Sequence, residues 1–511
     1  MNRRHFFHIA GAAAAAKMFS HSSLAQAQAQ TQTTSAMQSQ TKVGTASSGF
    51  QHNPRLTPIR GYRGQDVSCE SAYIEGKIPN SLRGHFYRNG PGLFERQGQR
   101  YQHWFDGDGM VHAWRFTDKG VSHQARFVGT NKFIAEQDAG EFLVPAFGTA
   151  IKPKMPVRSS DSMNTANTSV IKMNDRLYAL WEGGSAHALD PISLATEGIV
   201  SWTPELTGMP FSAHPKFEPD GTMWNFGTMM GKLVLYQFSP QGKLVQHHVM
   251  NAPSSAMVHD FVTSQGYLIF LFSPIHLDMK SVQNGVSMVQ AMQWKAQEAT
   301  KLLVIDKTDF SKTYLMELPA MMLFHFGNAW DDGQKIRLDF VKSKDMGNFQ
   351  SMMPKMMLGQ DVTGDPSSPA FLEIDVKKQR VSMTERTEIL EFPRVDPRVV
   401  GRRNRYVFYP YASDSSQYNA LNGVMRLDVE SGKVDRFHFG ERMRLEEHVV
   451  VPKAGSSKEG EAWLVGVGFD IQEQSSFASV FDAQNLAAGP VALARLPYWT
   501  PHCFHGNFYT S

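Results

Sequence analysis

The chain has 511 residues, of which 41% are hydrophobic and 19% charged, so it is too apolar for a disordered protein and long enough for a large core. Its 51 basic and 48 acidic residues leave a net charge of +3, which gives no support for a nucleic-acid partner. No apolar run reaches the roughly 18–20 residues that span a bilayer, and Cys69 and Cys503 are too few for a four-cysteine zinc site or a disulfide scaffold.

The first residues carry the features of a secretory signal. Arg3 and Arg4 form a twin-arginine pair, and a short apolar run and a group of small residues follow. We expect residues 1–30 to be a twin-arginine-type signal peptide, residues 31–52 a disordered linker rich in Gln, Ser and Thr, and residues 53–511 a single folded domain. The expected location is the periplasm, and the alternative is that the first segment is an ordinary amphipathic helix.

The rest of the chain consists largely of β-hairpin patterns. Seven stretches each contain an alternating apolar run, a polar turn and a second alternating run. Units of about 60 residues predict four-stranded blades, so we expect an all-β fold in the form of a seven-bladed β-propeller. Two successive β-sandwiches are the alternative. The predicted turns are marked by Asp118, Asp190, Ser239, Asp306, Asp375, Asp428 and Asp482.

Two regions, residues 132–163 and 345–360, interrupt this alternation. The second is rich in methionine, whose flexible thioether side chain fits irregular apolar surfaces. It is interpreted as a flexible part of the core, as one wall of a substrate passage, or as a loop that touches a membrane. The methionines concerned are Met346, Met352, Met353, Met356 and Met357.

Four of the 19 histidines share a sequence context typical of a buried strand end. His214, His259, His325 and His505 each lie within three residues of an aromatic side chain. A buried imidazole without a partner is costly, so such positions indicate a structural reason. Their spacings of 45, 66 and 180 residues correspond to roughly one, one and three units. Residues at the same phase of different blades converge on the propeller axis, where four imidazoles could therefore meet.

Four neutral imidazoles suit Fe, Cu, Zn or Ni rather than Ca or Mg. Each ligating ring normally needs an acceptor for its second nitrogen. Glu182, Glu391 and Glu447 are the candidates, since a carboxylate among apolar strand residues is unlikely to stand unpaired. His502 is close to His505 but lacks the shared context, so it is not counted as a ligand.

From about residue 55 to its end, the chain resembles the carotenoid cleavage oxygenases, a group that includes apocarotenoid and lignostilbene dioxygenases. The resemblance rests on a series of motifs that occur in the order of that family. These motifs are GHFYRNGPG (84–92), WFDGDGM (104–110), NTSVI (167–171), LWEGG (180–184), AHPKFEPDG (213–221), MVHDF (257–261), FHFGNAWDDG (324–333), LEFPR (390–394) and FHGNF (504–508).

The resemblance implies a seven-bladed propeller with a capping layer of loops and short helices over an axial metal site. It also implies one Fe(II) per subunit, with the methyl group of Thr168 crowding an open iron position and with no carboxylate partner for His214. The implied iron ligands are His214, His259, His325 and His505, and the implied carboxylate partners are Glu182 for His259, Glu391 for His325 and Glu447 for His505.

The implied reaction uses O2 to cleave a carbon–carbon double bond of an apolar alkene into two carbonyl products. We expect a carotenoid or apocarotenoid, with a stilbene or other phenylpropenoid of the lignostilbene or isoeugenol type as the alternative. A phenol-cleaving site would place Tyr and Lys near the hydroxyl, and Lys132, Lys152 and Lys154 do not decide the matter. A membrane-dissolved substrate would favour peripheral membrane contact around the tunnel mouth. A non-catalytic binding propeller and a zinc hydrolase are the other classes.

Two motifs also have structural interpretations. In RNGPG, glycine and proline predict a tight turn between strands. In WFDGDGM, Asp106 and Asp108 lack the full spacing of an EF-hand, so a turn that positions Trp104 is favoured over a calcium site. Cys503 is expected to be buried, and a disulfide to Cys69 is left open.

Overall fold

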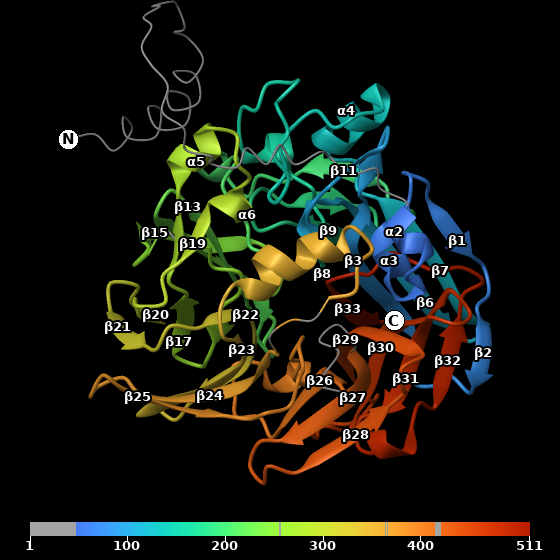
Figure 1. Ribbon diagram of the computed structural model, residues 1–511. Coiled ribbons are helices and arrows are strands. Elements are labelled where there is room, and N and C mark those ends of the chain that lie inside the picture. The colour runs from blue at the N-terminus through green and yellow to red at the C-terminus, as the bar shows by residue number, and fades with distance from the viewer. Residues whose placement is uncertain (1–47, 255–256, 363, 365, 414–420) are drawn as a thin grey trace, which may run out of the picture.

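The protein is a closed ring of antiparallel sheets. The computed structural model describes residues 48–511 except 255–256, 363, 365 and 414–420. Within these residues, seven sheets of three to five strands follow one another around a common axis (Figure 1). The predicted seven-bladed β-propeller is thereby confirmed, and the alternative of two successive sandwiches is rejected.

Burial along the strands follows from this packing. In β29 (Met443–Pro452), which lies next to the axis, all residues but the last are buried, because neighbouring blades cover both faces of the strand. In β7 (Gly120–Phe127), farther out, buried and half-buried residues alternate. The alternating sequence patterns therefore mark the outer strands, while the axial strands carry near-continuous buried runs.

The second, third and fourth blades are built by consecutive stretches of chain, from the axis outward. The second blade contains β8 (Ser169–Met173), β9 (Arg176–Leu180), β10 (His187–Leu189) and β11 (Thr196–Ile199). The third contains β12 (Lys216–Phe217), β13 (Met223–Met229), β14 (Lys232–Phe238) and β15 (Leu244–Asn251). The fourth contains β16 (Val262–Thr263), β17 (Tyr267–Phe272), β20 (Thr300–Asp306) and β21 (Thr313–Leu318).

The fifth and sixth blades continue the same order. The axial position of the sixth is taken by single bridges that pair Leu390 with Tyr411 and Arg394 with Phe408. The fifth blade contains β22 (Met322–Asp331), β23 (Lys335–Ser343), β24 (Ser368–Asp375) and β25 (Arg380–Glu385). The sixth contains β26 (Tyr406–Ala412), β27 (Leu421–Asp428) and β28 (Val434–His438).

Both ends of the described chain close the ring. The last strand, β33 (His505–Thr510), is the axial strand of the first blade, and β2 (Tyr73–Gly76) is the outer strand of the seventh. In Figure 1, β2 accordingly lies beside β32. The first blade also contains β3 (Gly84–Leu93), β6 (Asp108–Thr117), β7 and β1 (Val67–Cys69), and the seventh contains β29, β30 (Ala462–Asp470), β31 (Ser475–Asp482) and β32 (Ala492–Arg495).

All seven predicted turns lie between the third and fourth strands of a blade, counted from the axis. The reason is local: the turn carboxylate accepts hydrogen bonds from main-chain N–H groups two or three residues ahead. Asp190, for example, accepts from the amides of Ile192 and Ser193 at 3.1 and 2.7 Å. Asp428 does the same with Glu430 and Ser431.

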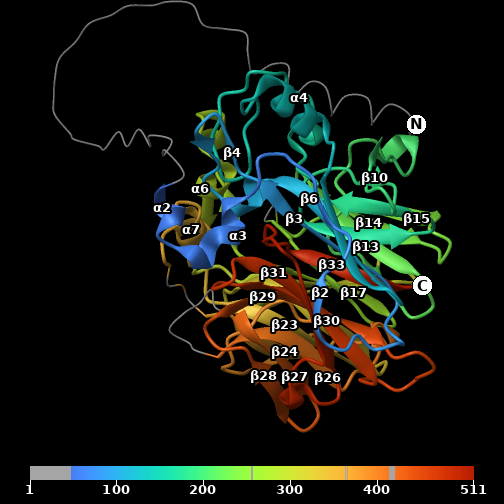
Figure 2. The same ribbon diagram turned by 90° about the vertical axis from the view of Figure 1, so that its right-hand side faces the viewer.

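Short helices gather on one side of the ring (Figure 2), as the capping layer predicts. Two small hairpins accompany them, formed by β4 (Glu95–Arg96) with β5 (Gln99–Arg100) and by β18 (Ile275–Leu277) with β19 (Met292–Trp294). The α-helices are α2 (Ser48–Gln51), α3 (Thr57–Arg60), α4 (Asn131–Ala139), α5 (Met279–Gln283), α6 (Met288–Ala291) and α7 (Met353–Met356). The other helical turns are η2 (Pro54–Leu56), η3 (Trp104–Asp106), η4 (Ser160–Met163), η5 (Pro204–Leu206), η6 (Asn348–Met352), η7 (Pro397–Val399) and η8 (Leu486–Ala488).

The turn predicted at RNGPG is wrong, because these residues continue β3. Gly90 of this motif is required for close packing rather than for a turn. A Cβ atom on Gly90 would lie 2.4 Å from the Cα atom of Cys503. The glycine thus permits the segment before β33 to pack closely against β3. In WFDGDGM (104–110), the two aspartates have partners within the protein. Asp106 accepts a hydrogen bond from Gly148 N, and Asp108 is paired with Lys132 Nζ at 2.6 Å. These contacts agree with the interpretation of the motif as a turn.

The folded part begins before residue 53. Residues 48–52 fall within the predicted linker 31–52, yet they include α2 and a buried Phe50 whose ring lies 4.6 Å from the Arg100 guanidinium carbon. The linker boundary at 52 is therefore corrected, because an aromatic anchor and an arginine compensate for the polar composition around them. The predicted signal peptide 1–30 lies outside the described residues and stays a prediction.

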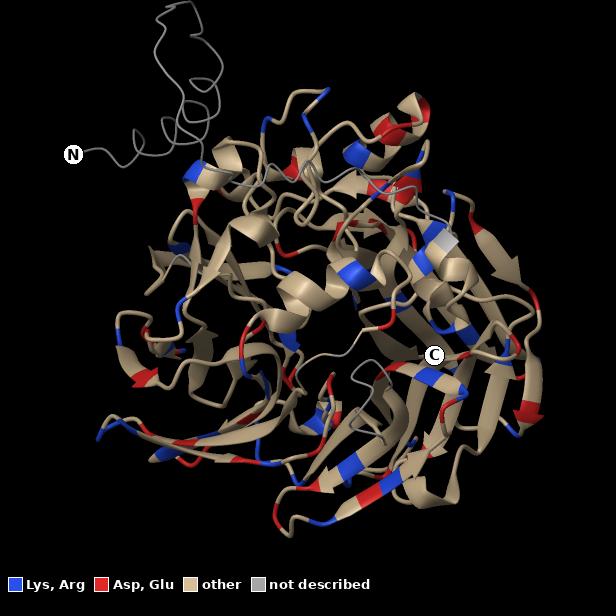
Figure 3. Cartoon of the chain, in the orientation of Figure 1, with Lys and Arg blue, Asp and Glu red and all other residues tan. Residues whose placement is uncertain are grey.

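Across the described residues, no helix combines the length and apolar character needed to cross a bilayer. Lysine and arginine residues are interspersed with aspartate and glutamate around the ring, without one face of a single sign (Figure 3). This distribution matches the near-neutral composition.

Cys69 and Cys503 are both free thiols, and burial raises the pKa of the Cys503 thiol well above its usual value. We expect two titratable thiols per chain in protein unfolded without reductant. In the native protein, Cys503 should react much more slowly with a thiol reagent than the half-buried Cys69. Thiol titration with and without denaturant measures this, and a chain with no free thiol after unfolding would establish the disulfide instead.

Candidate metal centre

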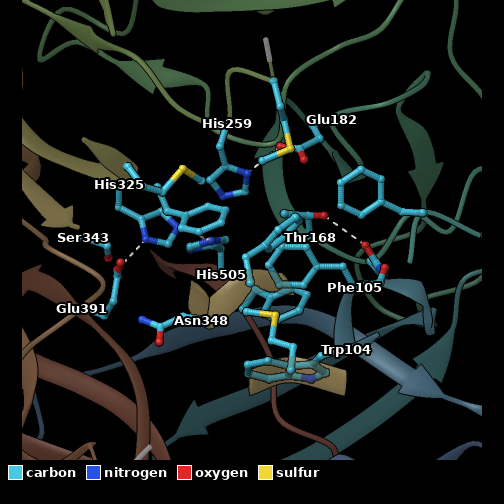
Figure 4. A pocket seen from close by; sticks show the side chains of 18 of the residues that line it. Trp104, Phe105, Thr168, Glu182, His259, His325, Ser343, Asn348, Glu391 and His505 are labelled. Carbon is cyan, nitrogen blue, oxygen red and sulfur yellow. Dashed lines mark hydrogen bonds and ion pairs between the residues drawn. The ribbon is translucent and has the colours of Figure 1, made fainter. Parts of the chain in front are cut away.

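The four histidines predicted from their context lie together on the propeller axis. His505 opens β33, His214 and His259 immediately precede the axial strands β12 and β16, and His325 lies within β22. One ring nitrogen from each lies within 4.8 Å of the other three, and all four are buried. They come from the first, third, fourth and fifth blades, so the sequence spacings correspond to steps around the ring. Figure 4 shows three of these rings converging.

The spacing of the rings suits a metal ion. Nε2 of His214 lies 2.9 Å from Nε2 of His259, and Nε2 of His325 lies 3.2 Å from Nε2 of His505. Two imidazole nitrogens bound at right angles to a metal at about 2.1 Å would be about 3.0 Å apart. Unprotonated nitrogens that face each other at such distances repel, and a cation between them converts that repulsion into ligation. The donor set therefore fits a transition-metal ion.

Three of the rings are oriented by carboxylates at their other nitrogen. The distances from Nδ1 to the carboxylate oxygen are 2.5, 2.6 and 3.0 Å, and they leave Nε2 free to face the centre. Among the described residues, no carboxylate pairs with His214. The pairs are Glu182 with His259, Glu391 with His325 and Glu447 with His505.

Burial keeps two of these rings, those of His214 and His505, neutral. It lowers the pKa of His505 to about 3, and burial together with the neighbouring imidazoles lowers the pKa of His214 well below its usual value. For His259, burial also acts to lower the pKa, but the Glu182 carboxylate outweighs it and raises the pKa. A neutral imidazole is the form that binds metal, so the environment of His214 and His505 prepares them for ligation.

Sequence reasoning missed the cations behind Glu447. Its two carboxylate oxygens accept from Arg88 Nη1 at 2.6 Å, Arg394 Nε at 2.9 Å and Gly506 N at 3.0 Å. Although burial acts to raise it, these neighbours and His505 hold the pKa of Glu447 well below its usual range. Both arginines lie in motifs already singled out, RNGPG and LEFPR, and a buried arginine in a strand was the signal for a carboxylate partner.

Thr168 lies just before the axial strand of the second blade and lines the cavity beside the histidines. Its hydroxyl donates to Asn167 Oδ1 at 3.0 Å, and Figure 4 shows this bond on the side away from the rings. The hydroxyl is thus engaged elsewhere, which leaves the rest of this small side chain toward the centre.

The centre opens into a cavity of about 790 Å³. Its walls are largely aromatic and thioether side chains, and Phe105, Phe324 and Phe349 pack edge to face or tilted against one another. Of the methionine-rich segment, Met352, Met353 and Met356 line the cavity, while Met346 and Met357 are buried in core clusters. Two of the interpretations of residues 345–360 therefore each apply to part of the segment: some of its methionines belong to the core, and others form a wall of the cavity.

The three lysines considered for a phenol do not line this cavity. Lys132 is fully buried between Asp108 and Glu136, at 2.6 and 3.0 Å, and Lys152 and Lys154 are exposed. No tyrosine occurs among the described residues that line the cavity. By contrast His502, which was not counted as a ligand, lines it and contacts Glu446 Oε1 through Nδ1 at 3.2 Å.

Comparison with known proteins gives concordant results. The profile of the RPE65 family, retinal pigment epithelial membrane protein, matches residues 62–510. Apocarotenoid-15,15'-oxygenase from Synechocystis sp. is 32% identical over 88% of this chain and 95% of its own length. Isoeugenol monooxygenase from Pseudomonas nitroreducens is 27% identical over 85% and 93%, respectively. The crystal structure of cobalt-substituted Synechocystis ACO superposes with a TM-score of 0.81 and 29% identity, covering 90% of this chain and 99% of that one.

Replacing one ligand should empty the centre without unfolding the propeller, which has its own core. For His325→Ala we expect bound metal per chain to fall at least about tenfold and circular dichroism to stay unchanged. His276→Ala is the matched control, since that exposed ring pairs with Glu298 at 2.7 Å outside the site. Elemental analysis of both variants measures the outcome, and unchanged metal content in His325→Ala would remove that ring from the ligand set.

Replacing an orienting carboxylate should weaken the metal rather than abolish it. Glu182→Gln keeps the shape of the side chain but removes the charge that fixes the His259 tautomer, so we expect metal affinity to drop about 10–100-fold. Glu298→Gln, at the exposed pair, should leave affinity unchanged. Competition with a chelator measures both, and equal affinities would show that the Glu182 carboxylate does not support the centre.

Proposed function

Because the chain belongs to the RPE65 (retinal pigment epithelial membrane protein) family, we propose that it is an Fe(II)-dependent oxygenase that cleaves a carbon–carbon double bond of an apocarotenoid or carotenoid with O2. Family membership also confirms the resemblance to the carotenoid cleavage oxygenases. The observation that carries the proposal is the opening of a buried four-histidine centre directly into a largely apolar cavity.

Iron is the proposed metal, one ion per chain. Four neutral imidazoles bring no negative charge to the ion, and such a set suits the later divalent transition metals, of which iron can activate O2. When bound, Fe(II) would supply that activation next to the alkene. His214, His259, His325 and His505 would hold it.

The residues of the cavity would hold the alkene and exclude water. Phe105, Phe324 and Phe349 form a continuous aromatic wall beside the histidines, and flat rings match the flat face of a conjugated chain. Met352 and Met356 add flexible surface on the same cavity. The proposed reaction requires no general base. The protein's contribution is to position the alkene and to exclude water from it.

The choice of substrate class rests on what lines the cavity. A phenol needs a hydroxyl partner, whereas Lys132 is engaged by Asp108 and Glu136 and no described tyrosine reaches the cavity. Lys232 does line the cavity, but its Nζ atom donates to Asn251 Oδ1 at 2.6 Å. A long apolar chain needs only the apolar walls that are present. The similarity to an apocarotenoid oxygenase supports the same choice. The similarity to isoeugenol monooxygenase makes a phenylpropenoid the second candidate.

We also propose export to the periplasm and peripheral membrane contact. Export is supported by the twin-arginine pair Arg3–Arg4 and the apolar run after it. Membrane contact is supported by Met230, which lines the cavity and is 80% exposed, and by Leu358, 48% exposed directly after α7. A substrate that is dissolved in lipid could then enter without crossing water.

Oxygen consumption with a panel of alkenes tests the function. With iron-loaded protein we expect turnover of an apocarotenoid alcohol or aldehyde and at least about tenfold lower kcat/KM on isoeugenol and on a hydroxystilbene. Product masses should correspond to two carbonyl fragments of one substrate. His325→Ala should show no turnover above background, and His276→Ala should match the unmodified protein.

Preferred turnover of the phenols would select the second candidate. Stoichiometric zinc in anaerobically purified protein, with no oxygen consumption on any alkene, would contradict the proposed oxygenase as a whole.

A further inference from the structure

We propose that the cavity contains a carboxylate subsite built around Arg444, which binds the acidic end of an apocarotenoid acid while the polyene lies along the apolar walls. The inference rests on the proposed function and narrows its substrate class. It follows from an arginine that lies inside the cavity without an anionic partner.

Arg444 is the second residue of β29 and lines the cavity, yet only 6% of it is exposed. Its Nη1 atom donates to the main-chain carbonyls of Glu441 and Met443, each at 2.9 Å. No described carboxylate lies within ion-pair distance of it. The charges that act on it are those of Arg55, which is positive, and Glu441, whose side chain is 69% exposed and is paired with Arg55 at 4.0 Å. A buried guanidinium without a counter-charge is costly and indicates a missing anionic ligand.

Arg444 remains charged at neutral pH. Burial lowers the pKa of its guanidinium to about 10, which still leaves it protonated. The fork of Nε and Nη2, which has no described partner, has the geometry that binds a carboxylate through two parallel hydrogen bonds. A ligand with a single hydroxyl would accept from only one of these two nitrogen atoms.

A second polar group lies on the same cavity wall. Glu446, two residues after Arg444, also lines the cavity and accepts from His502 Nδ1 at 3.2 Å and from Arg88 Nη2 at 3.0 Å. His502 lines the cavity as well, and its ring lies 6.4 Å from that of Phe469, whose Cα atom pairs with that of Arg444 across the sheet. Arg444 and His502 therefore lie in the same region of the cavity.

Arg444 differs from the two arginines beside it in having no ion pair among the described residues. Arg88 and Arg394 form ion pairs with Glu446 and Glu447. A ligand carboxylate at Arg444 would supply the counter-charge that these two arginines already have. An aldehyde or an alcohol could accept or share a hydrogen bond there but would not neutralise the guanidinium.

Fixing one end of a rigid polyene also fixes its register. With the carboxylate at Arg444, the double bond that lies against the four histidines is set by its distance along the chain from the acid group. The subsite would then select both the acidic substrate and the bond that is cleaved.

Binding to metal-free protein tests the subsite independently of catalysis. We would measure quenching of tryptophan fluorescence by all-trans-retinoic acid and by methyl retinoate, which share the polyene but differ in charge. We expect the acid to bind at least about tenfold tighter than the ester, as hydrogen bonds to charged groups warrant. Arg444→Gln should bring this ratio close to one by weakening only the acid. Arg444→Lys, which keeps the charge but loses the fork, should give an intermediate ratio.

Lys232→Gln is the matched control, since it removes another positive charge from the cavity lining and should keep the ratio of the unmodified protein. Equal binding of acid and ester by the unmodified protein, or an acid preference that survives in Arg444→Gln, would overturn the proposal. If Arg444→Gln does not fold, the ratio in the unmodified protein and in Arg444→Lys decides. If the protein prefers the acid but cleaves no alkene, the proposed function is refuted and the carboxylate subsite is supported. If it cleaves an alkene but shows no preference for the acid, the carboxylate subsite is refuted and the proposed function is supported.

Discussion

The organisation of this molecule depends on one electrostatic constraint, the meeting of four imidazole nitrogens within 4.8 Å of one another in a buried space. Lone pairs at such distances repel unless a cation lies between them. The rings are nevertheless held there, because carboxylates fix three of them from behind. The fold therefore holds, before any ion arrives, the arrangement that a bound cation would stabilise, which is preorganisation for metal binding.

Every blade contributes to this arrangement at or just before its axial position. Four blades supply the histidines, and the second, sixth and seventh supply Thr168, Glu391 and Glu447. His325, Glu447 and His505 lie within strands, whereas His214, His259 and Thr168 lie in the segments that lead into them. The capping helices and the methionine segment shape the cavity above the centre, together with blade residues such as Phe324 and Arg444.

Much of the fold was predictable because its signals are local. In five of the seven polar turns an aspartate carboxylate accepts from nearby amides, and in a sixth the Ser239 hydroxyl does so. The histidines stand in recognisable apolar surroundings. The failures involve partners that are distant in sequence. The need for Gly90 comes from the packing of Cys503, more than 400 residues later. The ion pairs of Arg88 and Arg394 with Glu447 could not be predicted, because they form only when distant strands meet in the assembled ring. The same holds for Arg444, which has no ion pair among the described residues.

The ring is closed by β33, and the first residue of that strand is His505. The strand that closes the first blade therefore also supplies the fourth imidazole. Docking of β33 beside β3 and completion of the donor set are one structural event, so a change that weakens the β3–β33 pairing would lower the affinity for metal as well as the stability of the ring.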